Sequence, residues 1–156
     1  MTKPSTATEA DDLRFMTAAL DEARLALDEG EIPVGAIVVC NGKIIGRGHN
    51  MTERLRDVTA HAEMLAITAA AATLGGKYLR DCTLYVTMEP CLMCAGAIGW
   101  SQLSRVVYGA EDPRRGFRAL TVADKPALHP STVLTAGVLA DEAKALLRNF
   151  FALLRP

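Results

Sequence analysis

The chain has 156 residues, of which half are hydrophobic and 22% are charged, and its formal net charge is -1 at pH 7. This composition is typical of one globular domain and excludes a disordered chain. The near-neutral charge excludes a general attraction to nucleic acid, so any contact with a phosphate backbone must come from a local basic patch. No apolar stretch is long enough for a signal peptide or a membrane span, which predicts a cytoplasmic protein without membrane contact.

The first elements are a helix and a hairpin. Apolar residues recur at helical spacing over residues 10–28, with a capping box from Thr8 to Asp11 and a stop at Gly30. Residues 1–9 are expected to form a flexible N-terminal extension. Two strands over residues 34–40 and 43–48 follow, joined by the pair Asn41-Gly42, which is the strongest short-range hairpin signal.

The rest of the chain alternates between helices and short strands. We expect helices over residues 60–74, 91–100 and 139–154, and strands over residues 83–88, 106–108 and 133–135. Residues 51–59 are expected to form a loop, and residues 111–130 form the least periodic stretch. The order predicts one α/β domain over residues 1–156, a three-layer α/β/α sandwich around a central mixed five-stranded sheet. The hairpin is its antiparallel part.

Two short segments carry the chemistry: His61-Ala62-Glu63 and Pro90-Cys91-Leu92-Met93-Cys94. Cysteines three apart at a helix start lie on one face, where unpaired backbone N–H groups stabilise thiolate charge. His61 also lies where a helix begins. If the two helix starts are adjacent, His61, Cys91 and Cys94 form a ligand set that zinc prefers and leave a fourth position for water. The spacing therefore predicts a catalytic zinc site.

Glu63 completes this site. It is too close to His61 along the chain to be a natural co-ligand, but it can approach the water and transfer its protons. Taken alone, Cys-x-x-Cys is also typical of a redox pair or half a structural zinc knuckle, and His-x-Glu of a polar helix cap. A structural zinc site needs a fourth ligand, and the remaining cysteines and histidines lack paired spacing: Cys40, Cys82, His49 and His129.

The combined pattern H-x-E…P-C-x-x-C resembles the signature of the cytidine/deoxycytidylate deaminase superfamily. The resemblance implies a cytidine deaminase-like fold, one Zn²⁺ per subunit and no organic cofactor. It also implies that a zinc-bound hydroxide attacks a ring carbon, that Glu63 shuttles the protons and that ammonia leaves.

More of the chain, from about residue 13 to residue 151, resembles one branch of that superfamily, the bacterial tRNA-specific adenosine deaminases. The similar segments are residues 31–36, 48–50, 59–63, 83–87, 89–97, 105–110, 137–142 and 149–151. The resemblance implies deamination at C6 of the wobble adenosine to inosine in the anticodon of arginine tRNA. It further implies that the enzyme is a homodimer.

The resemblance also implies a substrate pocket. In that branch the residue matching Asn50 hydrogen-bonds the flipped nucleotide, and the Ala62 N–H holds the side of the leaving group. The residue at Asp112 approaches a ribose hydroxyl, and three further residues line the pocket: Ile32, Pro33 and Val34. Taken from the residues alone, a turn is the alternative interpretation of Asn50 and of Asp112.

Several side chains keep two interpretations. Glu31 is typical of helix-terminal solvation as much as of a substrate contact. One of the adjacent Phe150 and Phe151 is expected in the core, and the other in the pocket or in solvent. Trp100 is expected to pack in the core or in a subunit interface.

The sequence departs from the branch after Asp112, where a Lys-Thr-Gly type stretch is usual. Here residues 113–118 are Pro-Arg-Arg-Gly-Phe-Arg, and the basic tail of the branch is nearly absent. We take Arg114, Arg115 and Arg118 as candidate RNA contacts, with a solvated surface loop as the alternative.

Two other functions stay open at this point. A guanine or free nucleoside deaminase of the same fold is favoured if the C-terminal segment folds over the pocket, because such a lid excludes a macromolecule. A non-catalytic zinc-binding protein predicts that Glu63 is dispensable.

Overall fold

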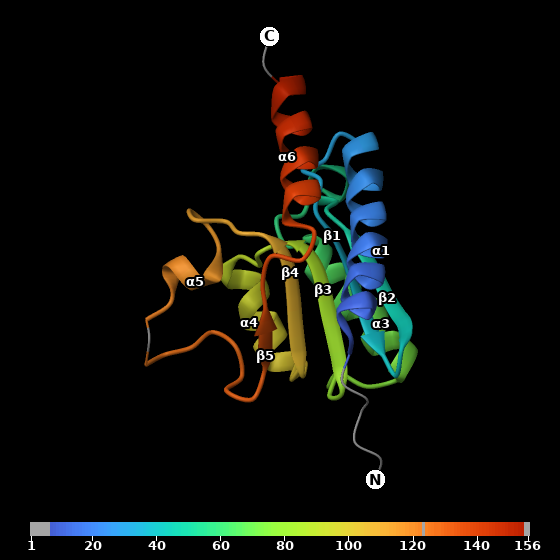
Figure 1. Ribbon diagram of the computed structural model, residues 1–156, viewed down its shortest axis with the longest axis vertical. Helices are drawn as coiled ribbons and strands as arrows, with labels where there is room; N and C mark the ends of the chain where they lie inside the picture. Colours follow the sequence, from blue (N-terminus) through green and yellow to red (C-terminus); the bar gives the residue numbers. More distant parts are fainter. Residues whose placement is uncertain (1–6, 123, 155–156) are drawn as a thin grey trace.

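A five-stranded sheet forms the centre of the computed structural model, which describes residues 7–122 and 124–154 (Figure 1). Its strands are β1 (Gly35–Cys40), β2 (Lys43–His49), β3 (Cys82–Met88), β4 (Arg105–Ala110) and β5 (Val133–Thr135). Their order is β2-β1-β3-β4-β5. β1 is antiparallel to both β2 and β3, whereas β3, β4 and β5 are parallel. The predicted mixed sheet is confirmed.

Helices cover both faces of the sheet and complete the predicted three layers. In Figure 1, α1 (Glu9–Asp28) and α6 (Ala140–Leu154) lie in front of the sheet, with α3 (Ala62–Leu74) and α4 (Leu92–Ser101) behind it. Two single-turn helices, α2 (Thr52–Leu55) and α5 (Phe117–Leu120), lie within the segments predicted to be a loop and the least periodic stretch.

The predicted start and stop signals of α1 are present. The Thr8 hydroxyl accepts a hydrogen bond from the Asp11 N–H at 3.1 Å, and the Asp11 carboxylate accepts one from the Thr8 N–H at 3.0 Å. Beyond the helix end, Gly30 has a φ of 77°, which favours glycine. Of the expected N-terminal extension over residues 1–9, Thr8 is the N-cap of α1 and Glu9 its first residue, and residues 1–6 lie outside the described residues.

The Asn41-Gly42 turn is also confirmed. Both residues have positive φ, 52° and 74°, as the two centre positions of a type I′ hairpin turn require. The turn joins β1 to β2 in an antiparallel pair whose register shifts once, between Val38 and Val39.

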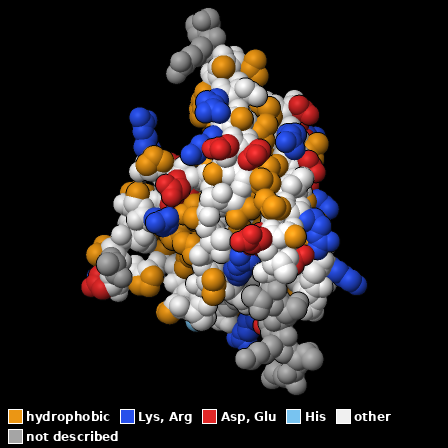
Figure 2. Space-filling view, in the orientation of Figure 1, with side chains coloured by type: hydrophobic (Ala, Val, Ile, Leu, Met, Phe, Trp, Pro, Cys, Tyr) orange, Lys and Arg blue, Asp and Glu red, His pale blue; other side chains and the backbone are white. Residues whose placement is uncertain are grey.

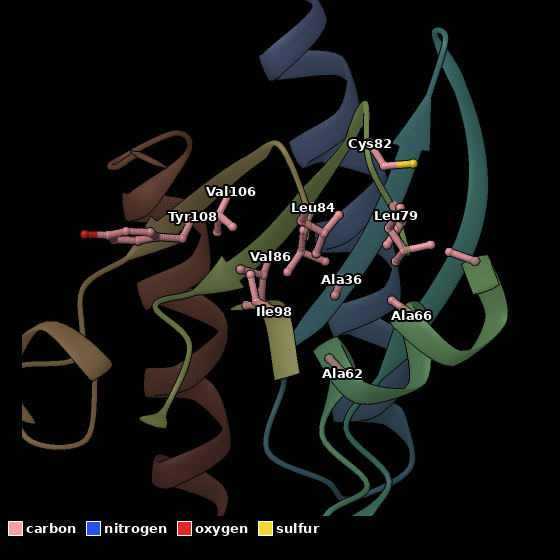
Figure 3. Close-up of a cluster of buried hydrophobic side chains, with 13 residues drawn as sticks. Ala36, Ala62, Ala66, Leu79, Cys82, Leu84, Val86, Ile98, Val106 and Tyr108 are labelled. Atoms are coloured by element: carbon pink, nitrogen blue, oxygen red, sulfur yellow. The ribbon is translucent and has the colours of Figure 1, made fainter. Parts of the chain in front are cut away.

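The larger core cluster lies between the sheet and the pair α3 and α4 (Figure 3). Alanines of α3 pack on β2 and β1, and Leu84, Val86 and Ile98 fill the centre. A second cluster lies under α1 on the other face and includes Met16 and Tyr85.

Glycine in β2 allows α3 to lie directly on the sheet. A Cβ on Gly48 would be 2.5 Å from the carbonyl oxygen of Ala62 and 2.7 Å from the amide nitrogen of Ala66. Both are backbone atoms, which cannot move without moving the helix. Gly48 therefore fixes the height of the first turn of α3 above the sheet.

We expect Gly48→Ala to damage the site at that first turn as well as the core. Overpacking of this kind costs about 1–3 kcal/mol, and α3 would shift away from the sheet. Zinc content and melting temperature, measured together, check this. Gly76→Ala is the matched control, because a Cβ there has no neighbour within 4 Å. A Gly48→Ala protein with the wild-type melting temperature and full zinc content would contradict this account.

Charges are dispersed over the molecular surface seen in Figure 2. Lys and Arg side chains are interspersed there with Asp and Glu, so this face presents no broad field of one sign. Among the described residues, no helix combines the length and the apolar character that crossing a bilayer requires.

Candidate active site

Two helix starts bring the three predicted zinc ligands together. His61 is the N-cap of α3 and Cys91 the N-cap of α4, so that α4 starts one residue later than predicted and Cys94 lies in its first turn. The His61 Nδ1 is 3.6 Å from the Cys91 Sγ and 3.5 Å from the Cys94 Sγ. Ligand atoms of all three residues lie within 4.8 Å of one another.

These distances fit a tetrahedral zinc ion. Zinc binds nitrogen at about 2.0 Å and sulfur at about 2.3 Å, and tetrahedral bonds of these lengths require a separation of about 3.5 Å between nitrogen and sulfur. The observed separations of 3.6 Å and 3.5 Å match that value. Two cysteines and one histidine also form a catalytic rather than a structural set, because three protein ligands leave one position open.

The protonation of this group follows from its contacts. A hydrogen bond from the Cys94 thiol, reinforced by His61, lowers the pKa of Cys91 to about 4. A hydrogen bond to Cys91 raises the pKa of His61. Burial raises the pKa of the Glu63 carboxyl, which is 4% exposed. Cys91 is thus held as a thiolate, and Glu63 is made more basic than a carboxylate in water, as a proton-transferring group requires.

A pocket of about 400 Å³ opens beside these residues, at the end of the sheet where β3 and β4 finish. Its walls include most of the side chains predicted to bind substrate: Ile32, Val34, Asn50, Ala62, Asp112 and Arg115. His61, Glu63 and Cys91 also line it. Pro33, Arg114 and Arg118 are absent from this lining.

Asn50 and Asp112 form turns and line the pocket at the same time. The Asn50 side-chain oxygen accepts a hydrogen bond from the Thr52 N–H at 3.4 Å. The Asp112 carboxylate accepts two, from the N–H groups of Arg114 and Arg115, at 3.1 Å and 3.0 Å. The two interpretations of each residue are therefore compatible, because a side chain that a turn fixes is also held in position for a ligand.

The three predicted RNA contacts differ in position. Arg115 lines the pocket. The Arg118 guanidinium donates a hydrogen bond to the hydroxyl of Tyr108, whose ring reaches outward from the core cluster (Figure 3). Arg118 is thus fastened to β4, and Arg115 is the arginine of this segment that faces the site.

The C-terminal helix contributes an apolar wall. Phe150 is buried, whereas Phe151 is 49% exposed and lines the pocket together with Leu147. This assigns the core to Phe150 and the pocket to Phe151. Trp100 does not pack in the core of the described chain, since 85% of it is exposed; an interface stays a prediction for it.

The sequence did not reveal the structural roles of two buried carboxylates, Glu31 and Glu89. Glu31 is 1% exposed and accepts hydrogen bonds from the N–H groups of Glu53 and Arg54, at 3.0 Å and 2.9 Å. It therefore caps α2, and neither solvation nor a place in the pocket lining describes it. Glu89 is 7% exposed and lines the pocket. The feature of the sequence that could have identified Glu89 is a charged residue directly after a buried strand.

Known proteins that resemble this chain are deaminases. The family model of the cytidine and deoxycytidylate deaminase zinc-binding region matches residues 9–110. A tRNA-specific adenosine deaminase of Aquifex aeolicus (strain VF5) is 45% identical over 143 residues, covering 90% of this chain and 94% of that protein. A structure from a study of A-to-I editing by tRNA deaminases at the wobble position of transfer RNA has a TM-score of 0.79 and 40% identity, covering 86% and 99%.

A guanine deaminase from Nitrosomonas europaea is similar as well, with a TM-score of 0.74 at 30% identity over 96% of this chain and 87% of that one. The matched zinc-binding region spans His61, Cys91 and Cys94, the described group whose ligand atoms are close enough to hold one metal ion. The chain belongs to the cytidine and deoxycytidylate deaminase family of zinc enzymes, and within it to the tRNA-specific adenosine deaminases.

Proposed function

We propose that this protein hydrolyses the wobble adenosine of a tRNA anticodon to inosine, with ammonia as the second product. The observation that carries the proposal is the composition of one pocket. Two of the zinc ligands, His61 and Cys91, line it together with Glu63. Asn50 and Asp112 add polar side chains, and a cation and an aromatic ring, Arg115 and Phe151, complete the three kinds of surface. A purine, its ribose and an adjoining phosphate require these three kinds of surface.

The chemistry assigned to Glu63 is proton transfer. Zinc, when bound, supplies the Lewis acidity that makes water a nucleophile near neutral pH. Glu63 takes one proton from the attacking water as the oxygen bonds to C6 of the purine and the double bond between C6 and N1 opens. It returns that proton to the exocyclic nitrogen, the bond from C6 to that nitrogen breaks as the ring double bond re-forms, and ammonia leaves. The proton left on the oxygen moves to N1, which gives inosine. The Ala62 N–H, at the first position of α3, has no partner within the helix and is free to bind a polar atom of the reacting base.

RNA is favoured over a free nucleobase by the position of α6. This helix contributes Leu147 and Phe151 to one wall and then extends beyond the body of the molecule (Figure 1). A free-base enzyme gains from a lid that closes over its ligand. The described part of α6 stands beside the pocket, which leaves the base of an extruded nucleotide a way in.

The finer points of the proposal rest on the relatives. The 41–45% identity to tRNA-specific adenosine deaminases supports tRNA as the substrate. That the protein is a cytoplasmic homodimer that acts on arginine tRNA is the finer part of this proposal. Three apolar side chains of α4 are exposed, which supports α4 as the surface that the second subunit covers: Leu92, Met93 and Trp100.

A substrate panel tests the proposal. Zinc-loaded protein is incubated with an arginine tRNA anticodon stem-loop that has adenosine at the wobble position, with the same RNA carrying cytidine there, and with free guanine, adenosine and cytidine. We expect ammonia from the adenosine stem-loop only. Ammonia from guanine, with the RNA unchanged, would replace the proposal by a guanine deaminase.

Arg115 and Arg114 form a matched pair for a test of RNA binding. We expect Arg115→Ala to weaken binding of the stem-loop by about tenfold and to lower the slope of log affinity against log salt by about 1, because one phosphate contact is lost. Arg114→Ala, which removes the same charge outside the pocket lining, should change the affinity less. Equal losses in both variants would mean that only net charge matters.

A further inference from the structure

We propose that Glu89 is a positioning residue: its buried carboxylate holds the segment 112–118 in the conformation that brings Asp112 and Arg115 to the pocket. The inference rests on the proposed function, because it assigns that segment to RNA binding. Glu89 has no part in the proton transfer described above, and its side chain acts through the segment that surrounds it.

The carboxylate of Glu89 binds both ends of this segment. One oxygen accepts a hydrogen bond from the Asp112 N–H at 3.3 Å, and the other accepts one from the Arg118 N–H at 3.1 Å. The backbone adds to this: the Phe117 N–H donates to the Pro90 carbonyl at 2.9 Å, and Cys91 and Gly116 form an isolated antiparallel bridge. The two ends of the segment are thus held together by the Glu89 carboxylate.

Gly116 provides an independent sign that the segment is shaped around Glu89. A Cβ at this position would be 2.1 Å from one Glu89 carboxylate oxygen and 2.5 Å from the Asp112 carbonyl oxygen. Its φ of -60° is open to any residue, so the requirement for glycine here is one of space and not of backbone freedom. The backbone of the segment lies directly against the carboxylate.

The position of Arg115 follows from these contacts. Within the segment, Asp112 accepts hydrogen bonds from the N–H groups of Arg114 and Arg115, and the Gly116 N–H donates to the Asp112 carbonyl at 2.9 Å. Glu89 fixes the N–H of Asp112, Asp112 fixes the turn, and the turn directs Arg115 to the pocket. Glu89 itself lies between β3 and the zinc ligand Cys91, so the position of the segment is tied to that of the metal site.

Glu89→Gln is the sharpest variant. It keeps the size of the side chain but replaces one of the two accepting oxygens by an NH₂ group, which would face a backbone N–H. We expect hydrogen exchange at the amides of Asp112 and Arg118 to become at least about tenfold faster, because a buried hydrogen bond to a charged acceptor is lost. The KM for the stem-loop should rise about tenfold, more than kcat falls. Zinc content should stay at one per subunit.

The matched control is Glu111→Gln, a neighbouring carboxylate with a 68% exposed side chain, whose contact with Arg118 is a long 3.9 Å. It should leave both amide exchange and KM near their wild-type values. A double variant separates positioning from general damage. If Glu89 acts by placing Arg115, Glu89→Gln should add less than about twofold to the KM of Arg115→Ala.

The outcomes separate the two proposals. Unchanged amide exchange in Glu89→Gln, which is measured without substrate, overturns the positioning role whatever the substrate is. Faster exchange with an unchanged KM overturns the assignment of the segment to RNA binding. The same holds if the KM increases of Glu89→Gln and Arg115→Ala multiply in the double variant. A wild-type protein that leaves the stem-loop unchanged overturns the proposed function instead, and the exchange result then stands by itself.

Discussion

Glu63→Gln is expected to lower kcat for the adenosine stem-loop by about 10³-fold while the protein keeps its zinc. General acid–base catalysis contributes about 10²- to 10⁴-fold, and the amide of glutamine can neither accept nor return a proton. The side chain is 4% exposed and lines the pocket beside His61 and Cys91. Single-turnover kinetics, with zinc measured on the same sample, checks this.

The result also decides between an enzyme and a zinc-binding protein. Substitution by glutamine preserves the size of a buried side chain, so we expect binding of the stem-loop to be retained. A Glu63→Gln protein with wild-type turnover would mean that the protons travel by another route. Loss of zinc in this variant would instead make Glu63 part of the ligand set.

Cys94→Ser is expected to remove the metal and with it all turnover. Cys94 is fully buried, and its Sγ is one of the three ligand atoms within 4.8 Å of one another. Substitution of a residue that only orients a zinc ligand lowers zinc affinity by about 10- to 100-fold. Loss of a thiolate that binds the metal directly should therefore lower it by more than about 100-fold. Zinc per subunit after dialysis, by atomic emission, is the measurement.

Cys40→Ser is the control for this substitution, because Cys40 is a free cysteine at the end of β1, outside the metal group. It should keep one zinc per subunit and full turnover. If Cys94→Ser retained tightly bound zinc, another protein group would have to replace Cys94 as the third ligand, and the proposed ligand set would be wrong.

The sequence predicted the parts of the fold that depend on local signals. Helix spacing, the capping box at Thr8 and the Asn41-Gly42 turn act within a few residues, and each is present in the structure. The mixed character of the sheet could be predicted because a two-residue turn demands antiparallel pairing and strand-helix-strand units favour parallel pairing. The zinc ligands belong to the same class, since His61 and Cys91 each mark a helix start.

The contacts that the sequence could not predict join residues that are far apart along the chain. Glu31 was open to two interpretations because nothing in its neighbourhood indicates that it accepts hydrogen bonds from residues 53 and 54. Glu89 serves residues more than twenty positions later in the same way. Likewise, three arginines in one basic stretch look equivalent as a sequence. Only the backbone of their segment turns Arg115 to the pocket and leaves Arg118 bound to Tyr108.

The most direct test of the account is the position of inosine in a whole tRNA. A full-length arginine tRNA transcript with adenosine at the wobble position is incubated with zinc-loaded protein, and the nucleosides of its anticodon fragment are identified by mass spectrometry. The account predicts one inosine per molecule, at the wobble position, with one equivalent of ammonia, and formation of inosine about 10³-fold slower with Glu63→Gln. An unchanged transcript under conditions in which the same protein releases ammonia from guanine would contradict it.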